Sequence, residues 1–374
     1  MVEWKKLGEV ASYYRGVTYN KKQEVPFNSG GTKILRANNI TLETNSLNFE
    51  DVKEISSNVI IKDFQWLYPN DILICAGSGS KEHVGKVAYI SSPLKYAYGG
   101  FMGKIIASEE LKPRFLFHIF SSSIFKKYLD VALNSTTINN LNSTLVNDFQ
   151  IPIPSLSEQE RIVGILDTFT ASIDNIKAQI EQRRKQYEHY RNTLLTFNKD
   201  DDCVEWNTLG EVAEIGTGSG NTNEGLAKGL YPFYTRGQEI LRKNEYEYDE
   251  QAVVTAGDGV GVGKVIHYVE GKYALHQRAY RFCPKKNLNT KFLFYYMKVT
   301  FYKYVCGNAV ASSVSSLRKP KLQVYPIPLP SLQEQQRIVS ILNTFEASIN
   351  NLEAQLEQRQ KQYEYYREKL LTFE

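Results

Sequence analysis

Apolar side chains recur in alternating steps of four and three residues along two long stretches of the chain. A period of about 3.5 residues held over several heptads is typical of coiled-coil helices, because it keeps one apolar stripe of each helix facing its partner. The pattern therefore predicts two long helices that pack against each other. The stripe of the first helix consists of Ile162, Leu166, Phe169, Ile173, Ile176 and Ile180. The stripe of the second consists of Ile338, Leu342, Phe345, Ile349, Leu352 and Leu356.

The two stretches are copies of each other. Between Glu158–Phe197 and Glu334–Phe373, 28 of the 40 paired positions are identical at a constant offset of 176 residues. Such self-similarity indicates an internal repeat. Each stripe is continued by an arginine, Arg183 or Arg359, which we expect to set the register of the helix pair.

Polar residues mark where each helix starts. Ser155 with Glu158, and Ser331 with Glu334, fit the capping box, in which the serine oxygen and the glutamate satisfy exposed backbone N–H groups reciprocally. We interpret the segment from Glu158 to Arg161 as residues that stabilise the start of the helix, with direct contact to a partner protein as the alternative.

The remainder of the chain is also duplicated, although less closely. VEWKKLGEVA at residues 2–11 returns as VEWNTLGEVA at residues 204–213. Later landmarks recur in the same order, and we pair Ile34–Ile40 with Phe233–Ile240, Asp71–Gly77 with Gln251–Gly257, and Val84–Val87 with Val262–Val265. The β-branched run that ends in glycine suggests a buried strand and a turn in each copy.

These repeats predict four regions: a globular domain over residues 1–150, a long helix over 151–200, a second globular domain over 203–327 and a second long helix over 328–374. Asn198 to Asp202 would be a short polar connector. We predict an α+β fold with two mixed α/β domains separated by two long antiparallel coiled-coil helices, arranged as a pseudo-twofold internal repeat. Two diverged domains at a fixed separation could read two different short targets.

Composition adds weak constraints. The formal net charge of +4 permits nucleic-acid binding only if positive charge is concentrated locally. The cysteines do not show metal-ligand spacing, so we expect no metal site. The sequence lacks an apolar run long enough for a membrane helix and a signal-peptide pattern at its start, which leads us to expect a cytoplasmic protein without a membrane partner.

The duplicated P-S-L-x-E-Q-x-R-I-V entry into a long helix, placed once centrally and once near residue 330, resembles the specificity subunits of type I restriction-modification systems. The resemblance implies that each globular domain is a target recognition domain reading one half of a bipartite site in double-stranded DNA. It also implies that the helices set the unspecified gap and dock two methyltransferase subunits. Those partners would bind S-adenosylmethionine and methylate adenine N6, restriction subunits can join them, and this chain would itself be non-catalytic and carry no cofactor.

Base readout requires side chains that offer paired donors and acceptors, such as arginine for guanine and asparagine or glutamine for adenine. In each case a solvated loop residue is the alternative. The candidates for DNA contact are Arg36, Asn38 and Asn39 in the first domain and Arg236, Gln238, His276, Gln277 and Arg278 in the second.

A glycine-rich segment, Gly257–Lys264, does not fit a nucleotide-binding P-loop, because its spacing is one residue too long and Val265 follows the lysine. It can be either a tight turn between strands or a backbone approach to DNA phosphate. In the second case Lys81, Lys86 and Lys264 would supply positive charge without specifying sequence.

Two other classes of function remain open. A coiled-coil scaffold without a DNA role accounts for the helices but gives the diverged domains no task. A self-contained DNA-modifying enzyme needs a full catalytic constellation, and neither an adenine-methyltransferase motif nor a zinc-protease motif is present in the sequence.

Overall fold

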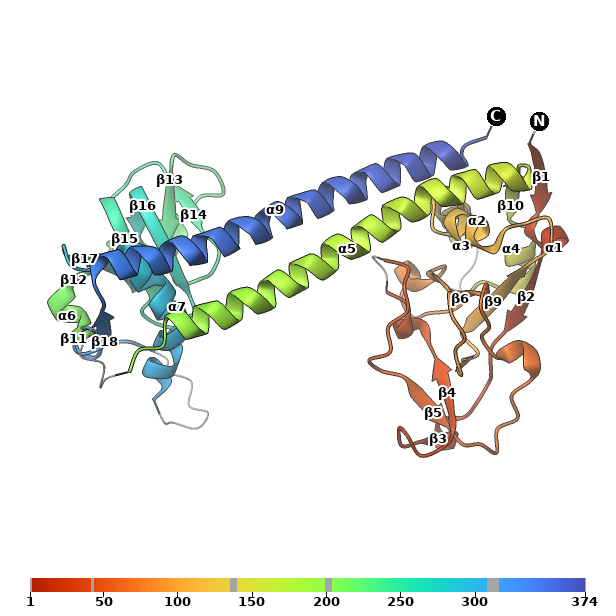
Figure 1. Ribbon diagram of the computed structural model, residues 1–374, viewed down its shortest axis with the longest axis horizontal. Helices are drawn as coiled ribbons and strands as arrows, with labels where there is room; N and C mark the ends of the chain where they lie inside the picture. Colours follow the sequence, from red (N-terminus) through yellow and green to blue (C-terminus); the bar gives the residue numbers. More distant parts are fainter. Residues whose placement is uncertain (1, 42–43, 135–139, 199–203, 308–315, 374) are drawn as a thin grey trace. The chain divides into compact units, whose positions relative to one another are not determined.

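The computed structural model of the chain describes residues 2–41, 44–134, 140–198, 204–307 and 316–373 (Figure 1). The chain folds into two units. The first unit comprises residues 1–176 and 355–374, and the second comprises residues 177–354. The predicted connector therefore lies, apart from Asn198, outside the described residues. Both long helices, α5 (Leu156–Leu194) and α9 (Leu332–Leu371), contribute one segment to each unit.

The first unit is built on short strands. Within its described residues, an antiparallel sheet has the spatial order β2 (Ala11–Arg15), β9 (Met102–Ala107), β6 (Ile72–Cys75), β7 (Val87–Tyr89). A second sheet has the order β3 (Glu24–Val25), β5 (Lys53–Ile55), β4 (Thr32–Leu35), β8 (Ala97–Tyr98), with β4 and β8 parallel. β1 (Glu3–Lys6) pairs with β10 (Gln150–Ile153), which crosses the domain boundary predicted at residue 150.

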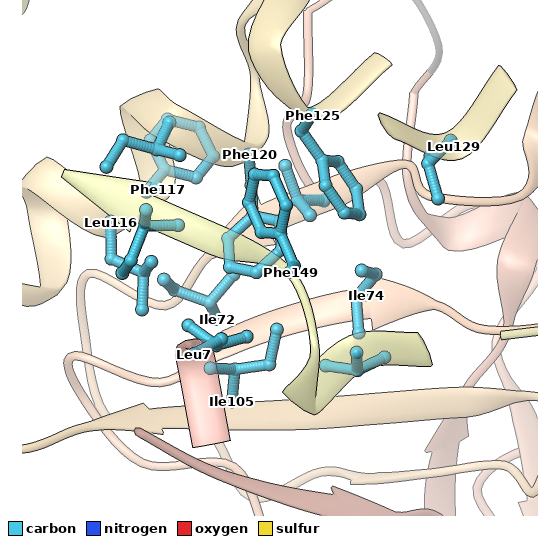
Figure 2. Close-up of a cluster of buried hydrophobic side chains, with 14 of the residues drawn as sticks. Leu7, Ile72, Ile74, Ile105, Leu116, Phe117, Phe120, Phe125, Leu129 and Phe149 are labelled. Atoms are coloured by element: carbon cyan, nitrogen blue, oxygen red, sulfur yellow. The ribbon is translucent and has the colours of Figure 1, made fainter. Parts of the chain in front are cut away.

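Helices cover one face of the β2–β9–β6–β7 sheet. They are α1 (Leu7–Val10), α2 (Pro113–Phe120), α3 (Ser123–Asn134) and α4 (Ser143–Asn147). The unit also contains short 3-10 turns at η1 (Lys21–Gln23), η2 (Ala37–Asn39), η3 (Asp63–Gln65) and η4 (Lys81–His83). Figure 2 shows Ile72, Ile74 and Ile105 of the strands facing Phe120 and Phe149 in one buried cluster. All four residues of β6 are fully buried, which confirms the predicted buried strand. Burial of each large apolar side chain stabilises the unit by about 1.5–3 kcal/mol.

The second unit repeats this plan as a single sheet. Its spatial order is β12 (Ala213–Thr217), β17 (Ala279–Pro284), β15 (Tyr248–Ala256), β16 (Ile266–Leu275), β13 (Tyr231–Tyr234), β14 (Leu241–Lys243). β11 (Glu205–Thr208) pairs with β18 (Pro326–Leu329) as β1 pairs with β10. The helical elements are α6 (Leu209–Val212), η5 (Thr222–Glu224), α7 (Thr290–Cys306) and α8 (Lys319–Gln323).

The sheets differ because one long strand of the second unit is divided in the first. β16 pairs antiparallel with β15 along its length and parallel with β13 at its end. In the first unit the corresponding pairings are made by two separate strands, β7 and β8. Pro93 lies between them, and proline cannot donate the hydrogen bond that a continuous strand would need there.

Strand pairing corrects one of the sequence correspondences and confirms the start of another. Ile74 pairs with Gly103 as Thr255 pairs with Tyr280, and Ala76 accepts a backbone hydrogen bond from Leu141 as Gly257 does from Leu317. The equivalent of Gly257 is therefore Ala76, one residue before the Gly77 predicted from sequence.

The confirmed correspondence is that of Ile34 with Phe233. Leu35 pairs with Tyr98 as Tyr234 pairs with Leu275, which makes Thr235 the equivalent of Arg36. Arg36 and Arg236 are therefore one residue out of register.

The two long helices pair antiparallel within each unit. In the second unit Arg184 Nη2 lies 2.6 Å from Glu353 Oε1, and the Tyr187 hydroxyl donates to Glu346 over 2.9 Å, so residue numbers fall along α5 as they rise along α9. In the first unit the end of α9 lies beside the start of α5 (Figure 1). Each of the twelve predicted stripe residues is buried or half-buried.

Aromatic contacts between the helices are duplicated. In the first unit Phe169 stacks on Tyr366 with ring centroids 5.3 Å apart, and in the second unit their sequence equivalents Phe345 and Tyr190 stack at 5.3 Å. The guanidinium groups of Arg359 and Arg183 lie over the same two phenylalanine rings, at 5.7 and 5.8 Å. The arginines of the stripe are thus held by cation–π contacts with the partner helix.

The first turns of each helix pack into a domain core instead of against the partner helix alone. Ile162 and Leu166 belong to the buried cluster of the first unit, together with Leu371 from the end of α9. Ile338 occupies the matching place in the second unit, together with Leu195 just after α5. Each globular core is therefore completed by residues from both long helices.

Glutamine, not the predicted capping box, ties each helix start to its domain. The serine half of the box is present, since Glu158 N donates to Ser155 Oγ over 3.3 Å. Glu158 instead pairs with Arg161 at 2.6 Å. The fully buried Gln159 side chain accepts from Lys112 N and donates to the carbonyl oxygens of Glu110 and Pro154.

The same set recurs in the second unit. Gln335 accepts from Asn289 N and donates to the carbonyl oxygens of Asn287 and Pro330. Glu334 pairs with Arg337 at 2.7 Å.

Across the described ranges, no helix combines the length and apolar character needed to cross a membrane.

Candidate nucleic-acid interface

In the first unit the predicted readers gather around an aspartate. Arg36 precedes the η2 turn that follows β4, Asn38 lies within that turn, and both reach Asp51. Arg36 Nη2 donates to Asp51 Oδ2 over 2.7 Å, and Asn38 Nδ2 donates to the same oxygen over 2.9 Å. Asn38 is exposed and Arg36 is half-buried, so one carboxylate orders two side chains at the surface.

Asn39 and Lys86 were also predicted to contact DNA, and the structure places both inside the unit. Asn39 is fully buried, where its Oδ1 accepts from Arg36 N and its Nδ2 donates to Asn48 O. The Lys86 ammonium donates to the carbonyl oxygens of Ala37 and Ile40, and burial lowers its pKa. Both residues support the turn that carries Arg36 and Asn38 instead of facing solvent.

Lys86 and Lys264 differ in their exposure to solvent because the strands that follow them pair one residue out of register. Val87 pairs with Ile74, while Ile266 pairs with the equivalent Thr255, which places Val265 at the position of Lys86. A slip of one residue moves a side chain to the opposite face of a strand. Lys264 is consequently exposed, with its ammonium 5.5 Å from the centre of the Tyr302 ring.

In the second unit three segments bring Arg236, Asp258 and Arg278 together. Arg236 follows β13, Asp258 follows β15, and Arg278 lies in the turn between β16 and β17. Arg236 Nη1 is 3.0 Å from Asp258 Oδ1, and Arg278 Nη1 is 2.9 Å from Asp258 Oδ2. Partial burial acts to raise the pKa of Asp258, but the hydrogen bonds from both arginines outweigh it and hold this pKa below its usual value.

Backbone hydrogen bonds fix these segments to one another. Gly257 N donates to Arg278 O over 2.8 Å, and His276 N donates to Tyr234 O over 2.9 Å. Thr235, Arg236, Asp258 and the following glycines also line a cavity of about 460 Å³. The two arginines are therefore carried by a rigid framework beside a hollow in the surface.

The other predicted residues of this unit divide into exposed and internal ones. Gln238 and Gln277 are exposed, and the Gln277 amide donates to Asn221 Oδ1. His276 is buried, and its Nδ1 accepts from Arg278 N over 2.9 Å, so it supports the turn. Burial lowers the pKa of His276, in keeping with a neutral ring that accepts at Nδ1. Lys81, in the η4 turn of the first unit, is exposed.

The glycine-rich segment forms the connection between β15 and β16. Gly259 and Gly263 adopt φ of +77° and +73°, a conformation that favours glycine. The segment thus forms a turn between two strands. Among the described residues, no group of three or more His, Cys, Asp or Glu side chains is placed to hold a metal ion.

The sequence matches the type I restriction modification DNA specificity domain over residues 1–183 and 203–360. This chain belongs to that family.

Relatives in the family match all or part of the chain. A putative type I restriction enzyme specificity subunit of Haemophilus influenzae is 27% identical over 406 residues, covering 100% of this chain and 96% of that protein. The EcoR124I/EcoR124II specificity subunit of Escherichia coli is 32% identical over 257 residues, covering 60% of this chain and 63% of that subunit. The match to the StySPI specificity subunit of Salmonella potsdam, at 33% identity, covers 50% of this chain and 40% of that subunit. The chain thus matches less than two thirds of the length of these last two relatives.

Solved structures agree on the fold. The S subunit of a type I restriction-modification system from M. genitalium aligns with a TM-score of 0.62 at 16% identity, covering 100% of this chain and 97% of that one. The HsdS subunit of Thermoanaerobacter tengcongensis aligns with a TM-score of 0.53 at 19% identity, covering 99% and 96%.

Within this family fold, equivalent positions of the two recognition domains carry different chemistry. The residue after Ala76 is Gly77, whereas the residue after its equivalent Gly257 is Asp258. Ala76 N donates to Phe101 O as its equivalent Gly257 N donates to Arg278 O, so Phe101 and Arg278 occupy matching turns. Phe101 is 76% exposed.

Sequence reasoning missed the two aspartates that order the candidate readers. Asp258 lies within the glycine-rich segment, which was considered as a turn or a phosphate contact but not as a source of side chains that order the arginines. Asp51 lies between β4 and β5, at the start of a segment with little periodicity. The sequence offered one signal for this role, which was an aspartate near predicted arginines in a turn-rich region. Residues 36 and 51 are far apart along the chain, and only the fold brings them together.

Proposed function

We propose that this chain is the DNA-recognition subunit of a type I restriction-modification complex, with each unit reading one half of a bipartite site. The observation that carries the proposal is the combination of one duplicated fold with unlike side chains at matching surface turns. Duplication supplies two reading surfaces of the same shape, and divergence gives them different donors and acceptors.

The chemistry of these turns suits base edges. Arginine can bond guanine through two acceptors in the major groove, and asparagine can do the same with adenine. Arg36 and Asn38 offer such groups in the first unit, and Arg236, Arg278 and Gln277 do so in the second. Exposed Lys81 and Lys264 would position the protein on the phosphate backbone without reading sequence.

The paired helices would set the gap between the half-sites and dock two methyltransferase subunits. Support comes from the duplicated arginine–phenylalanine and tyrosine–phenylalanine contacts, which resist sliding of one helix along the other. The partners would bind S-adenosylmethionine and methylate adenine N6, and restriction subunits could join the assembly. This chain would itself be non-catalytic and would act in the cytoplasm.

The decisive experiment is co-expression of the chain with a modification subunit in cells that lack other adenine methyltransferases, followed by mapping of methylated adenines across the genome. We expect one bipartite motif with an unspecified gap. A stable complex that creates no such motif would contradict the proposal. The purified complex should also lose DNA affinity steeply as salt rises, since phosphate contacts release counterions, whereas a scaffold would show a flat response.

A further inference from the structure

Asp258 holds the two candidate arginines of the second unit in a single cluster. Its carboxylate oxygens accept separately from Arg236 and Arg278 at 3.0 and 2.9 Å. The aspartate side chain is 19% exposed, whereas those of Arg236 and Arg278 are 40% and 62% exposed. The carboxylate thus lies behind the guanidinium groups, and the arginines form the outer surface.

Arg236 and Arg278 both bond Asp258 through Nη1. A guanidinium offers five N–H donors in a planar fork, so each side chain retains donors for an incoming group while its plane is restrained. Restraint matters because bidentate recognition requires both N–H groups to point at two acceptors at once. A carboxylate that fixes an arginine lowers the entropy lost on binding.

A base edge fits this cluster better than a phosphate does. With one carboxylate between two guanidinium groups, the formal charge of the cluster is +1 and not +2, which weakens its attraction for a polyanion. The half-buried negative charge of Asp258 beside the site also repels a phosphate directly. Guanine O6 and N7 carry only partial negative charge, so the carboxylate opposes their approach far less than that of a phosphate, and the planar fork matches their spacing.

The first unit lacks this arrangement. Gly77 stands where the second unit has Asp258, and Phe101 stands where it has Arg278. The cluster is therefore a property of one recognition domain and not of the shared fold.

We propose that Asp258 is a specificity-determining positioning residue that orients Arg236 and Arg278 to read guanine, so that the half-site recognised by the second unit contains at least one G·C pair. This inference rests on the proposed function and deepens it by naming the base.

The test compares the methylation motif of the wild-type complex with those of D258N and R278K. D258N removes the charge that holds both arginines while keeping a side chain of the same shape. R278K keeps the charge but removes the planar fork. We expect the wild-type half-site to contain guanine, and each variant to lose roughly ten- to a hundredfold of its discrimination at a guanine position, the range of one bidentate contact. The other half-site and the gap should not change.

Controls separate this effect from misfolding. E245Q removes an exposed carboxylate of the same unit outside the cluster and should leave the motif intact. Thermal unfolding of each variant complex verifies assembly, and if D258N fails to assemble, R278K decides the question alone. To assign the half-sites, the first domain is exchanged for that of another family member. The half-site that stays unchanged in the methylation motif is the one read by the second unit.

Several results would overturn the inference. One is a second half-site without a G·C pair, and another is unchanged base preference in an assembled R278K complex. A uniform loss of methylation at every position would indicate a phosphate contact instead. In all three cases a bipartite motif still exists, so the proposed function survives, whereas the absence of any bipartite motif would remove both.

Discussion

Gln159 and Gln335 each make three side-chain hydrogen bonds to backbone groups at the start of a long helix. Both side chains are fully buried, and a buried amide is stable only when its donors and acceptors are satisfied. The glutamine of the repeated E-Q-x-R motif therefore joins helix and domain, while the glutamate and the arginine pair with each other at the surface.

Replacing Gln159 with alanine should destabilise the first unit by roughly 2–5 kcal/mol, because Lys112 N–H and two carbonyl oxygens would lose their partners. Urea unfolding of the chain measures this change. Gln182→Ala, at an exposed position of the same helix, should change stability by less than about 0.5 kcal/mol. Equal effects of the two substitutions would show that Gln159 does not hold the junction.

His118 makes the stability of the first unit depend on pH. Burial, the strongest influence, lowers its pKa from 6.5, although the hydrogen bond from its Nε2 to Asp167 at 2.9 Å opposes this shift. Arg114 and Arg367 also disfavour its charged form, and the Tyr363 hydroxyl lies 3.3 Å from Nδ1.

Because the unfolded histidine takes up a proton near pH 6.5 and the folded one does so only at lower pH, stability is complete above about pH 6.5 and falls as the pH decreases below it. We expect urea midpoints to fall between about pH 7 and pH 5.5, and to fall less in His118→Gln. Burial also lowers the pKa values of His267 and His276, so the variant should keep part of the slope. A midpoint that rises on acidification would contradict this assignment.

At the scale of elements, one residue of strand register decides which side chains face solvent. The same Val-Gly-Lys-Val motif buries Lys86 in one unit and exposes Lys264 in the other, because the strand that follows is shifted by one position. The long helices behave differently, since their identical heptads place identical contacts at the same spacing in both units.

Inserting one heptad after Ile176 and another after the equivalent Leu352 should lengthen the gap in the DNA motif by roughly three base pairs, since seven helical residues add about 10 Å. Both half-sites should keep their sequence, because the insertions lie between the aromatic contacts of the two units. Insertion into one helix alone should weaken complex assembly, as the aromatic pairs can no longer all form. Mapping of methylated adenines tests the gap, and a change of bases at constant spacing would argue against helices that set the distance.

At the scale of the whole molecule, each unit combines its own globular segment with segments of both long helices. In the first unit, Leu371 of α9 packs in the same buried core as Leu7 of α1. Exchange of a recognition domain must therefore respect these contacts. β10 continues to Ile153, and Gln159 requires the backbone of residues 110–112.

Replacing residues 1–153 with the corresponding segment of another family member should change one half of the methylation motif and leave the other half and the gap unchanged. A chimera cut at residue 150 should be less stable, since it would combine strand β10 from two proteins. Motif mapping and thermal unfolding of both chimeras check these expectations. A swap at residue 153 that changes both halves would contradict independent reading by the two units.

The sequence by itself determined the features that depend on periodicity and repetition, namely two helices with apolar stripes and two diverged copies of one α+β domain, whereas contacts such as Arg184–Glu353 showed the antiparallel direction. A heptad pattern is local, so spacing along the chain is enough to identify it. Tertiary structure alone decided which polar residues face solvent. Lys86, Asn39 and His276 became internal supports because their neighbours in space come from distant strands and turns, and Asp51 and Asp258 acquired their roles because the fold places them beside arginines remote in sequence. Hydrogen-bond satisfaction in a buried site depends on which segments meet there, and a linear pattern does not contain that information.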